Sequence, residues 1–532
     1  MSFRVLRKGM KARRCMLVSR QHGSNISCCA SSPDTYMKFL SLSAVASALF
    51  TLTNFVVPSA VAQNGILTTA QKSAPSQQVT GQTPSLIPAV QTTTSAPGTM
   101  TYTVKRGDSI PSLVRSYLPK TSYMTFPEFE AALRQANGGR HGNMLHPGES
   151  LVIPGFEESV REKSIPVARD FEVRAVYLTG IMAGSARGMR IIERWRQVGG
   201  NAVVFDVKDS DGILNTPGFS DPLVSRHRPC IRNLPKFVRY LHAQHMHAIA
   251  RIAIFRDEAL VDSHPDLAVQ SHRNKTAWHE NGKLVWTDPS RPEVQKYNIA
   301  IAKFAAQAGV DEIQFDYVRF PAEGDQKDAT FAFYTSHPQW KRSDVIADFL
   351  DKAYTELHPT GVLLSLDVFG VMAWQRPVDL SHTGQDIVAM AKHCDVLSPM
   401  IYPSHFFGME GYAHPGDAPD HFISESMKKF EQITAGSGVV IRPWLQAFAW
   451  RTKSYSPEYI VTQVTAAKKT GGIGFLFWNA NNDYSKPFVA MPEMRATPGK
   501  FFRGDELPGT ATAHASRTAP GQPTGQQTPL VQ

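Results

Sequence analysis

Eight short apolar runs that alternate with helical patterns constrain the fold of this chain more than any other feature. Each run is about four to eight residues long, which is the length of a buried strand. Between the runs, residues 185–199 carry a helical period that Ser185 is placed to cap and Gly199 to stop, and another helix opens at Pro292. The runs cover residues 173–178, 202–207, 248–254, 312–315, 362–368, 396–400, 440–445 and 473–477.

Parallel strands joined by helices close most readily into a barrel, because the crossovers share one hand. We therefore expect an α/β protein whose main domain is a (β/α)8 TIM barrel over residues 171–485. The weakest points of this prediction are the long segment between the third and fourth runs and the poor helical pattern after the eighth. They leave an open, doubly wound sheet as the alternative.

The positive charge of the chain is concentrated in a leader, residues 1–62. The formal net charge is +10, and the leader holds eight Lys and Arg against one acid, which leaves 10 − 7 = +3 for all other residues. A domain that binds nucleic acid normally carries a clear excess of basic residues. We therefore expect no nucleic-acid partner.

The leader has the features of a signal peptide. An apolar run at residues 39–57 follows Lys38 and precedes an A-x-A cleavage site at 60–62. Cleavage would leave Gln63 as the first residue, and Met37 is the more typical start for such a signal. We expect an exported protein of the periplasm or cell envelope, or a secreted one, with no stable membrane span after cleavage. A single membrane anchor is the alternative, since the run is nearly long enough to cross a bilayer.

Segments of low complexity flank the parts that read as folded. Residues 63–100 and 504–532 are rich in Gln, Thr, Ser, Pro, Gly and Ala without a hydrophobic period, which predicts a disordered linker and a disordered tail. Cys230 and Cys394 are the cysteines that remain after the leader. They can form one disulfide or stay as two free thiols.

A small module is predicted at residues 101–155. It opens with "YTVKRGDSI", contains the helical stretch "FPEFEAALRQANG" and closes with "LHPGESLVIP", which gives a β-α-α-β order. Its two ends resemble those of the LysM glycan-binding module. That resemblance implies binding to a glycan with N-acetylglucosamine, such as peptidoglycan; a structural domain is the alternative.

Polar and aromatic side chains follow most of the eight runs. In a barrel of this kind the C-terminal ends of the strands surround the active site. Carboxylates at the ends of runs two to five, with aromatic and amide side chains at six to eight, are typical of glycoside hydrolysis, which needs a carboxyl pair and flat surfaces for sugar rings. In chain order these residues are Asp206, Lys208, Asp209, Arg256, Asp257, Asp316, Tyr317, Arg319, Asp367, Tyr402, Gln446, Trp450, Trp478 and Asn479.

Other chemistries have weaker support in the sequence. No His and Cys set has zinc spacing, and His242, His245 and His247 read better as surface or core residues. A phosphate-binding loop and a serine nucleophile elbow are both missing. We expect neither a metal nor a cofactor.

Six motifs carry a resemblance to a known family. They are "VRAVYLTG", "VVFDVKDSDG", "DEIQFDYVRFP", "SLDVFG", "LSPMIYPSHF" and "GGIGFLFWNA", in this order over residues 171–485. The chain resembles bacterial glycoside-hydrolase-like barrel domains of largely undefined function that are related to α-amylase-like barrels. The resemblance implies a TIM barrel with a site for sugar cleavage.

The resemblance also implies roles for single residues. α-Amylase-like enzymes have an aspartate nucleophile at the end of strand four, where this chain has Asp316. Their acid is a glutamate at strand five, where Asp367 stands, and Gln446 replaces their third carboxylate at strand seven. Chitinase chemistry is disfavoured, because Gln314 and Val318 replace the second aspartate and the acid of the D-G-x-D-x-D-x-E motif.

We therefore expect an exported glycoside hydrolase that acts on an envelope or extracellular polysaccharide, with Asp316 and Asp367 as catalytic residues. A noncatalytic glycan-binding protein and a structural envelope protein are the alternatives. In those cases Asp316 would be a structural partner of Arg319 or Lys208, and Arg256 and Asp257 would pair with each other. The expected substrate-binding residues are Asp206, Lys208, Asp209, Asp257, Tyr317, Arg319, Tyr402, Gln446, Trp478 and Asn479.

Overall fold

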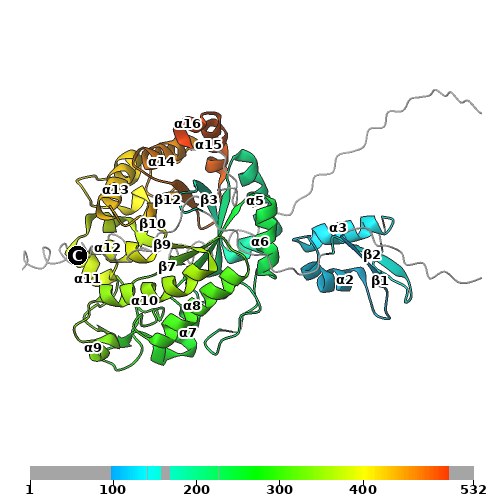
Figure 1. Ribbon diagram of the computed structural model, residues 1–532, viewed down its shortest axis with the longest axis horizontal. Helices are drawn as coiled ribbons and strands as arrows, with labels where there is room; N and C mark the ends of the chain where they lie inside the picture. The colour runs from blue at the N-terminus through cyan, green and yellow to red at the C-terminus, as the bar shows by residue number, and fades with distance from the viewer. Residues whose placement is uncertain (1–97, 140–141, 157–167, 226, 503–532) are drawn as a thin grey trace, which may run out of the picture.

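The computed structural model describes residues 98–139, 142–156, 168–225 and 227–502 (Figure 1). The predicted signal peptide and tail, and nearly all of the predicted linker, lie outside these residues. Among the described residues, none of the helices is both long and apolar enough to cross a bilayer.

The main domain is a closed barrel of parallel strands. Each strand pairs in parallel with its neighbours, and β13 returns to pair with β3 through Gly474 and Val173. This confirms the predicted (β/α)8 architecture and rules out the open sheet. The strands are β3 (Val173–Leu178), β4 (Ala202–Lys208), β5 (His247–Ala253), β7 (Glu312–Asp316), β9 (Leu363–Phe369), β10 (Val396–Ile401), β11 (Val440–Ile441), β12 (Trp444–Gln446) and β13 (Gly474–Trp478).

The seventh strand differs from the prediction. A single run over 440–445 was expected, but the structure divides it into β11 and β12, which both pair with β10. Pro443 lies at the break. Proline has no N–H to give to a ladder of hydrogen bonds, so the strand is interrupted where it stands.

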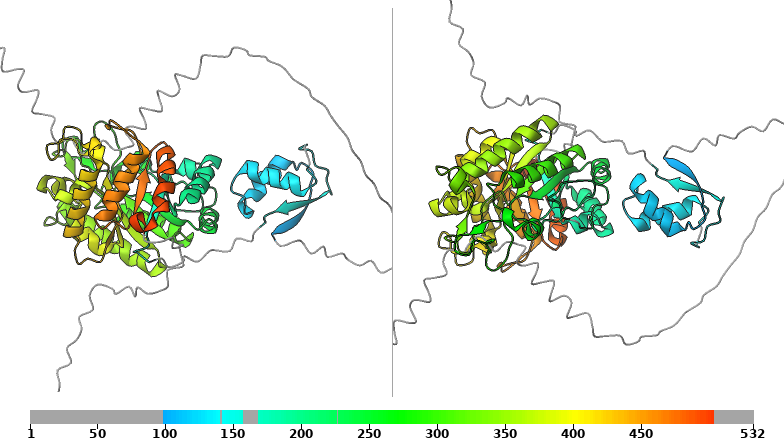
Figure 2. Two further views of the ribbon diagram at one scale, coloured as in Figure 1. Left: turned by 90° about the horizontal axis from the view of Figure 1, so that it is seen from above. Right: turned by 90° about the horizontal axis from the view of Figure 1, so that it is seen from below.

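Helices surround the barrel (Figures 1 and 2). Ser185 caps α5 by accepting the N–H of Gly188, and Gly199 ends this helix with a φ of 110°, a value that favours glycine. Pro292 stands in the first turn of α8, as predicted. The helices are α4 (Gly180–Ala183), α5 (Ala186–Val198), α6 (Leu234–Ala243), α7 (Glu258–Ser263), α8 (Pro292–Gln307), α9 (Phe333–Ser336), α10 (Arg342–Leu357), α11 (Pro377–Thr383), α12 (Ile387–Met390), α13 (Pro419–Ile433), α14 (Pro457–Lys469), α15 (Ser485–Ala496) and α16 (Pro498–Phe501).

Two apolar clusters form the core. The larger one lies between the strands and the helices and continues to Phe502, beyond the expected domain limit at 485. The smaller one fills the inside of the barrel and takes Ala175, Val204 and Leu476 from three different strands. Strands that are buried on both faces explain why their sequences read as nearly continuous apolar runs.

A buried ion pair crosses the barrel where β7 begins. Arg442 Nη1 donates to Glu312 Oε2 over 2.8 Å, and His247 Nε2 lies 3.0 Å from the same oxygen. Burial alone would raise the pKa of Glu312, but Arg442 and His247 lower it to about 2. The opposite end of the barrel interior holds the predicted site residues.

The described residues of the N-terminal module have the predicted β-α-α-β order. β1 (Thr99–Thr103) pairs in an antiparallel manner with β2 (Ser150–Pro154), and α2 (Ile110–Tyr117) and α3 (Phe126–Ala136) pack over them (Figure 1). Pro111 lies in the first turn of α2, where a missing N–H has no cost. A short antiparallel pair, β6 (Gln270–Ser271) with β8 (Ala329–Thr330), belongs instead to two loops of the barrel.

The module contacts the barrel at α6. Lys236 Nζ donates to the carbonyl oxygen of Leu118 over 2.5 Å and also to that of Tyr123. The guanidinium of Arg232 lies 4.1 Å from the ring centre of Phe126. Both cysteines of the described part, Cys230 and Cys394, are free thiols.

Candidate active site

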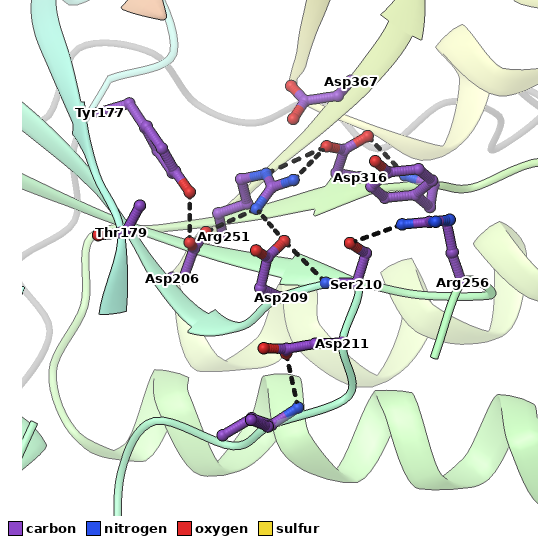
Figure 3. A network of polar contacts seen from close by, with 12 residues as sticks. Tyr177, Thr179, Asp206, Asp209, Ser210, Asp211, Arg251, Arg256, Asp316 and Asp367 are labelled. Carbon is purple, nitrogen blue, oxygen red and sulfur yellow. Dashed lines mark hydrogen bonds and ion pairs between the residues drawn. The ribbon is translucent and has the colours of Figure 1, made fainter. Parts of the chain in front are cut away.

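Arg251 is the centre of a cluster of carboxylates at the C-terminal end of the barrel interior (Figure 3). It projects from β5, and its side chain is 2% exposed. Nη1 donates to Asp206 over 2.6 Å and to Asp209 over 3.1 Å, while Nη2 donates to Asp316 over 2.6 Å. One guanidinium thus connects three of the predicted site residues.

Asp316 is the last residue of β7, and both of its carboxylate oxygens are engaged. Arg251 donates to Oδ2 through Nε and Nη2, and the N–H of Tyr317 donates to Oδ1 over 2.6 Å. Tyr317 has a φ of 54°, a left-handed conformation that is costly for a residue with a bulky side chain. Strain of this kind is often found at functional sites, and here it turns the chain sharply beside the carboxylate.

Asp367 lies on β9 beside Asp316 (Figure 3). The strand register pairs Phe315 with Leu366, so the two aspartates occupy the next position on adjacent strands, about 4.8 Å apart at the backbone. Trp444 Nε1 donates to Asp367 Oδ1 over 2.7 Å. Among the described residues, none makes a hydrogen bond to Oδ2.

Burial and charge act together on Asp367. Desolvation raises its pKa well above the usual value, and the negative charge of Asp316 raises it further; Arg251 and the Trp444 hydrogen bond act in the opposite direction. Burial, followed by the charges of Asp367 and Asp316, also raises the pKa of Tyr402, which places this ring close to both carboxyl groups. The surroundings of Asp367 therefore favour its protonated form.

The cluster gathers negative charge. Within the described part of the chain, Asp206, Asp209 and Asp316 all pair with the guanidinium of Arg251. Such a site favours positive charge that develops in its centre, because preorganised charges act strongly where water is excluded. A glycosyl transition state has oxocarbenium character and develops that charge.

Aromatic rings form the wall of the cluster. Tyr177 donates from its hydroxyl to Asp206 over 2.5 Å, and its ring stacks on Trp478 with centroids 4.1 Å apart. Arg251 lies 5.3 Å from the ring centre of Trp478. The rings of Trp478 and of Tyr402 are buried, so they support the charged groups and present little open surface to a sugar.

Lys208 and Asp257 lie apart from this cluster. They form a buried ion pair of 2.6 Å, and Asp257 also caps α7 by accepting the N–H of Leu260. A shift in the strand register between Asp206 and Lys208 turns Lys208 away from the interior. The alternatives in which Lys208 pairs with Asp316, and Arg256 with Asp257, are therefore wrong.

Arg256 and Arg319 flank Tyr317. Arg256 donates to Ser210 Oγ over 2.9 Å and lies 5.6 Å from the ring centre of Tyr317. Arg319 is buried near the rings of Trp286, Tyr317 and Phe369, and desolvation lowers its pKa. Among the described residues, Asp316 pairs with Arg251 and not with Arg319, so the alternative of an Arg319 pair is wrong.

The two predicted amides organise loops at the barrel mouth. Gln446 accepts the N–H of Ser404 and donates to the carbonyl oxygen of Phe448. Asn479 donates to the carbonyl oxygen of Ala447 over 2.6 Å. Both connect the loops that follow β10, β12 and β13.

Sequence reasoning missed Arg251, Tyr177 and Trp444. Arg251 stands in the run "AIARIAIF", where one charge interrupts apolar residues. A charge in a buried strand requires partners, so this interruption was the available signal. Among the described residues, no group of three or more His, Cys, Asp and Glu side chains is arranged to hold a metal ion.

Comparisons with known proteins place the barrel in a family. Residues 175–484 match the model of the family described as "Putative glycosyl hydrolase domain". Among curated proteins, no sequence matches this chain.

Three similar solved structures illustrate the range of likeness. A hypothetical protein from Ruminiclostridium thermocellum is 34% identical, with 36% of this chain and 97% of that chain covered and a TM-score of 0.32. The glycoside hydrolase domain of PgaB (BpsB) from Bordetella bronchiseptica is 16% identical, with 62% and 99% covered and a TM-score of 0.46. The spore cortex-lytic enzyme SleL from Bacillus megaterium is 13% identical, with 76% and 87% covered and a TM-score of 0.38.

The family match spans more than half of the 532 residues and contains every strand end that contributes to the carboxylate cluster. By this match, the chain belongs to the family described as "Putative glycosyl hydrolase domain".

Proposed function

We propose that this protein hydrolyses O-glycosyl bonds in a polysaccharide of the cell envelope or the extracellular space. Asp316 is the nucleophile and Asp367 the general acid and base. The observation that carries the proposal is the pair itself. Asp316 lies at the end of β7 and accepts hydrogen bonds from Arg251. Asp367, whose pKa is raised well above its usual value, lies beside it on β9.

In the first step, Asp316 Oδ1 attacks the anomeric carbon while the bond to the leaving oxygen breaks. Asp367 gives its Oδ2 proton to that oxygen, and a glycosyl ester of Asp316 forms. The Trp444 hydrogen bond occupies Oδ1 of Asp367 and leaves Oδ2 for the proton. This division of roles needs one protonated and one ionised carboxyl group, which is the state that the environment of the pair favours.

In the second step, Asp367 is a carboxylate and takes a proton from water. The hydroxide that forms attacks the anomeric carbon and releases Asp316, so the configuration is retained. Retaining enzymes separate their carboxyl groups by about 5 to 5.5 Å, and inverting enzymes by about 6.5 to 9.5 Å. Asp316 and Asp367 occupy adjacent positions on neighbouring parallel strands, an arrangement that favours the shorter separation and hence retention.

Hydrolysis is tested with purified protein and a panel of bacterial polysaccharides and peptidoglycan, by measuring new reducing ends. Cleavage by the wild type that is lost in Asp316→Asn supports the proposal. Asp395→Asn is the matched control, because Asp395 is also buried but lies where β10 begins, away from the cluster. Binding without cleavage in every variant would instead support a noncatalytic glycan-binding protein.

We propose further that the N-terminal module is a LysM-type domain that holds the protein on peptidoglycan. Its β-α-α-β order and the sequences of its two ends support this role. Deletion of residues 101–155 should abolish co-sedimentation with peptidoglycan. Sedimentation that persists would assign wall binding to the barrel.

Export is the third part of the proposed function, and it rests on the predicted signal peptide. N-terminal sequencing of the protein recovered from the envelope fraction should begin at Gln63. A chain that keeps residues 1–62 would contradict cleavage and would support the alternative of a membrane anchor.

A further inference from the structure

A surface hollow of about 440 Å³ lies beside the barrel mouth, outside the carboxylate cluster. It is formed by the loops that follow β10 and β12, so it lies at the same end of the barrel as Asp316 and Asp367. Its lining includes Phe407, His414, Asp417, Arg451, Thr452 and Lys453. No predicted site residue is among them.

Arg451 is the main charged group of the hollow. Its guanidinium carbon lies 4.4 Å from the ring centre of Trp450 and 5.2 Å from that of Phe407. Among the described residues, none accepts a hydrogen bond from this guanidinium or forms an ion pair with it. Contact with the rings orients the planar group and leaves its N–H groups available to a ligand.

The backbone holds Arg451 in this position. Its φ is 50°, a conformation that costs free energy for a residue with a Cβ. Gly416 of the facing loop allows the close packing, because a Cβ there would come within 2.2 Å of the Arg451 carbonyl oxygen. The two loops are thus fitted to each other around the hollow.

A second polar group in the hollow has an unmet hydrogen bond. Thr452 Oγ1 is buried, and within the described part of the chain it has no hydrogen-bond partner. A buried hydroxyl without a partner is unfavourable and uncommon in native proteins. A ligand with polar oxygens would satisfy it, and the same ligand would meet the free N–H groups of Arg451.

The local charge is positive. Asp417 is engaged by Lys453, whose N–H donates to Oδ1 over 2.6 Å and whose Nζ lies 3.7 Å from Oδ2. Burial and the charge of Arg451 lower the pKa of His405 to about 4, so this neighbour is neutral near pH 7. Arg451 is left as the charge that is not compensated.

Aromatic rings connect the hollow with the catalytic pair. Tyr402, close to Asp367, lies 5.3 Å from His405, and His405 lies 4.9 Å from Trp450, measured between ring centres. Trp450 in turn contacts Arg451. Phe407, at the rim, is 51% exposed and offers an open face to a sugar ring.

We propose that this hollow is a subsite for a sugar that carries a carboxylate, placed away from the bond that is cleaved. The carboxylate binds the N–H groups of Arg451, a sugar hydroxyl binds Thr452, and the ring packs on Phe407. The substrate is then an acidic polysaccharide. This inference rests on the proposed function, because the cleaved bond defines the direction in which the glycan lies along the barrel mouth. The carboxylate can belong to a uronic acid or to the lactyl group of a muramic acid.

Binding is measured by calorimetry on the full chain with Asp316→Asn, which prevents turnover. One pair of probes is a galacturonic acid oligosaccharide and its carboxyl-reduced form. The other is an oligosaccharide of alternating N-acetylglucosamine and N-acetylmuramic acid and a chitin oligosaccharide of equal length. Arg451→Gln is compared with Arg190→Gln, which removes an exposed arginine of α5.

The proposal predicts that one acidic probe binds more tightly than its neutral match, and that added salt weakens this preference. Arg451→Gln should lower the affinity for that probe about ten- to hundredfold, because a charge-assisted hydrogen bond is lost. Arg190→Gln should have no effect. The probe pair that shows the preference identifies the source of the carboxylate.

Equal affinity within both pairs, or a preference that survives Arg451→Gln, would overturn the subsite. The N-terminal module is the same in all variants, so its own glycan binding cancels when two variants are compared on the same probe. If the protein prefers an acidic probe but cleaves no glycan, the proposed hydrolase activity is refuted and the proposed subsite is supported. If it cleaves a glycan but shows no acidic preference, the hydrolase activity is supported and the subsite is refuted.

Discussion

Replacing Asp367 with asparagine should remove the general acid while the fold is kept. The loss in kcat/KM should be about 10²- to 10⁴-fold on a glycan, which is the usual contribution of a positioned acid. An aryl glycoside with a strongly acidic phenol needs no proton at the leaving oxygen and should lose far less. Comparing phenols of low and ordinary pKa therefore separates loss of the acid from general damage to the site.

The pH dependence of kcat/KM tests the role of Asp367 independently. Because the pKa of Asp367 is raised, wild-type kcat/KM should fall as pH rises through that pKa, and this alkaline limb should be absent in Asp367→Asn. Equal losses on both aryl glycosides, or an alkaline limb that persists in the variant, would refute the assignment. Asp395→Asn is the control and should keep the limb.

The raised pKa also affects stability. In the unfolded chain Asp367 has a pKa of about 3.9, so the folded protein binds this proton more tightly than the unfolded chain does. The folded protein therefore becomes less stable as pH rises from the unfolded pKa to the folded pKa. Each unit between the two values corresponds to about 1.4 kcal/mol. The melting temperature of Asp367→Asn relative to the wild type should therefore increase over this pH range. A constant difference would contradict the buried, protonated state.

Three further predictions concern other groups of the barrel. Arg251→Gln should lower the free energy of unfolding at pH 7 by about 3–5 kcal/mol, because buried carboxylates lose their counter-charge; the loss should be smaller near pH 4, and denaturation at both pH values checks this. Removing both members of the ion pair with Lys208→Met and Asp257→Asn should leave KM within about twofold, since a pair outside the site does not touch substrate; a large rise in KM would restore both residues to it. Tyr317→Gly removes a buried ring and should destabilise by about 3–5 kcal/mol despite relief of its strained φ, as thermal unfolding can measure; a gain in stability would show that strain outweighs packing.

Most of the barrel could be predicted because its strands are buried on both faces. Such strands appear in sequence as nearly continuous apolar runs, and caps such as Ser185 and Gly199 set the helix ends between them. The strand breaks at Pro443 because proline has no N–H to donate to the neighbouring strand. A pattern of apolar residues alone does not show this break. The interior ion pair of Glu312 and Arg442 joins residues far apart in sequence, so no local pattern indicated it.

The carboxylates of the site could be predicted because the C-terminal ends of parallel strands converge in a barrel. The counter-charge of these carboxylates could not be predicted in the same way, because Arg251 stands inside a strand and not at its end. Lys208 was misplaced for a physical reason as well. Regular alternation puts Asp206 and Lys208 on the same face, and the register shift between them reverses this.

In the proposed mechanism, Asp316 forms a covalent bond to the sugar. This bond can be detected by mass spectrometry of the Asp367→Asn variant after it is mixed with an aryl glycoside of the sugar that the wild type cleaves. In this variant the intermediate forms but lacks the base that would hydrolyse it. We predict a mass increase of one glycosyl unit on the peptide that contains Asp316. An adduct on another residue, or turnover without any adduct and with inverted configuration, would contradict the account.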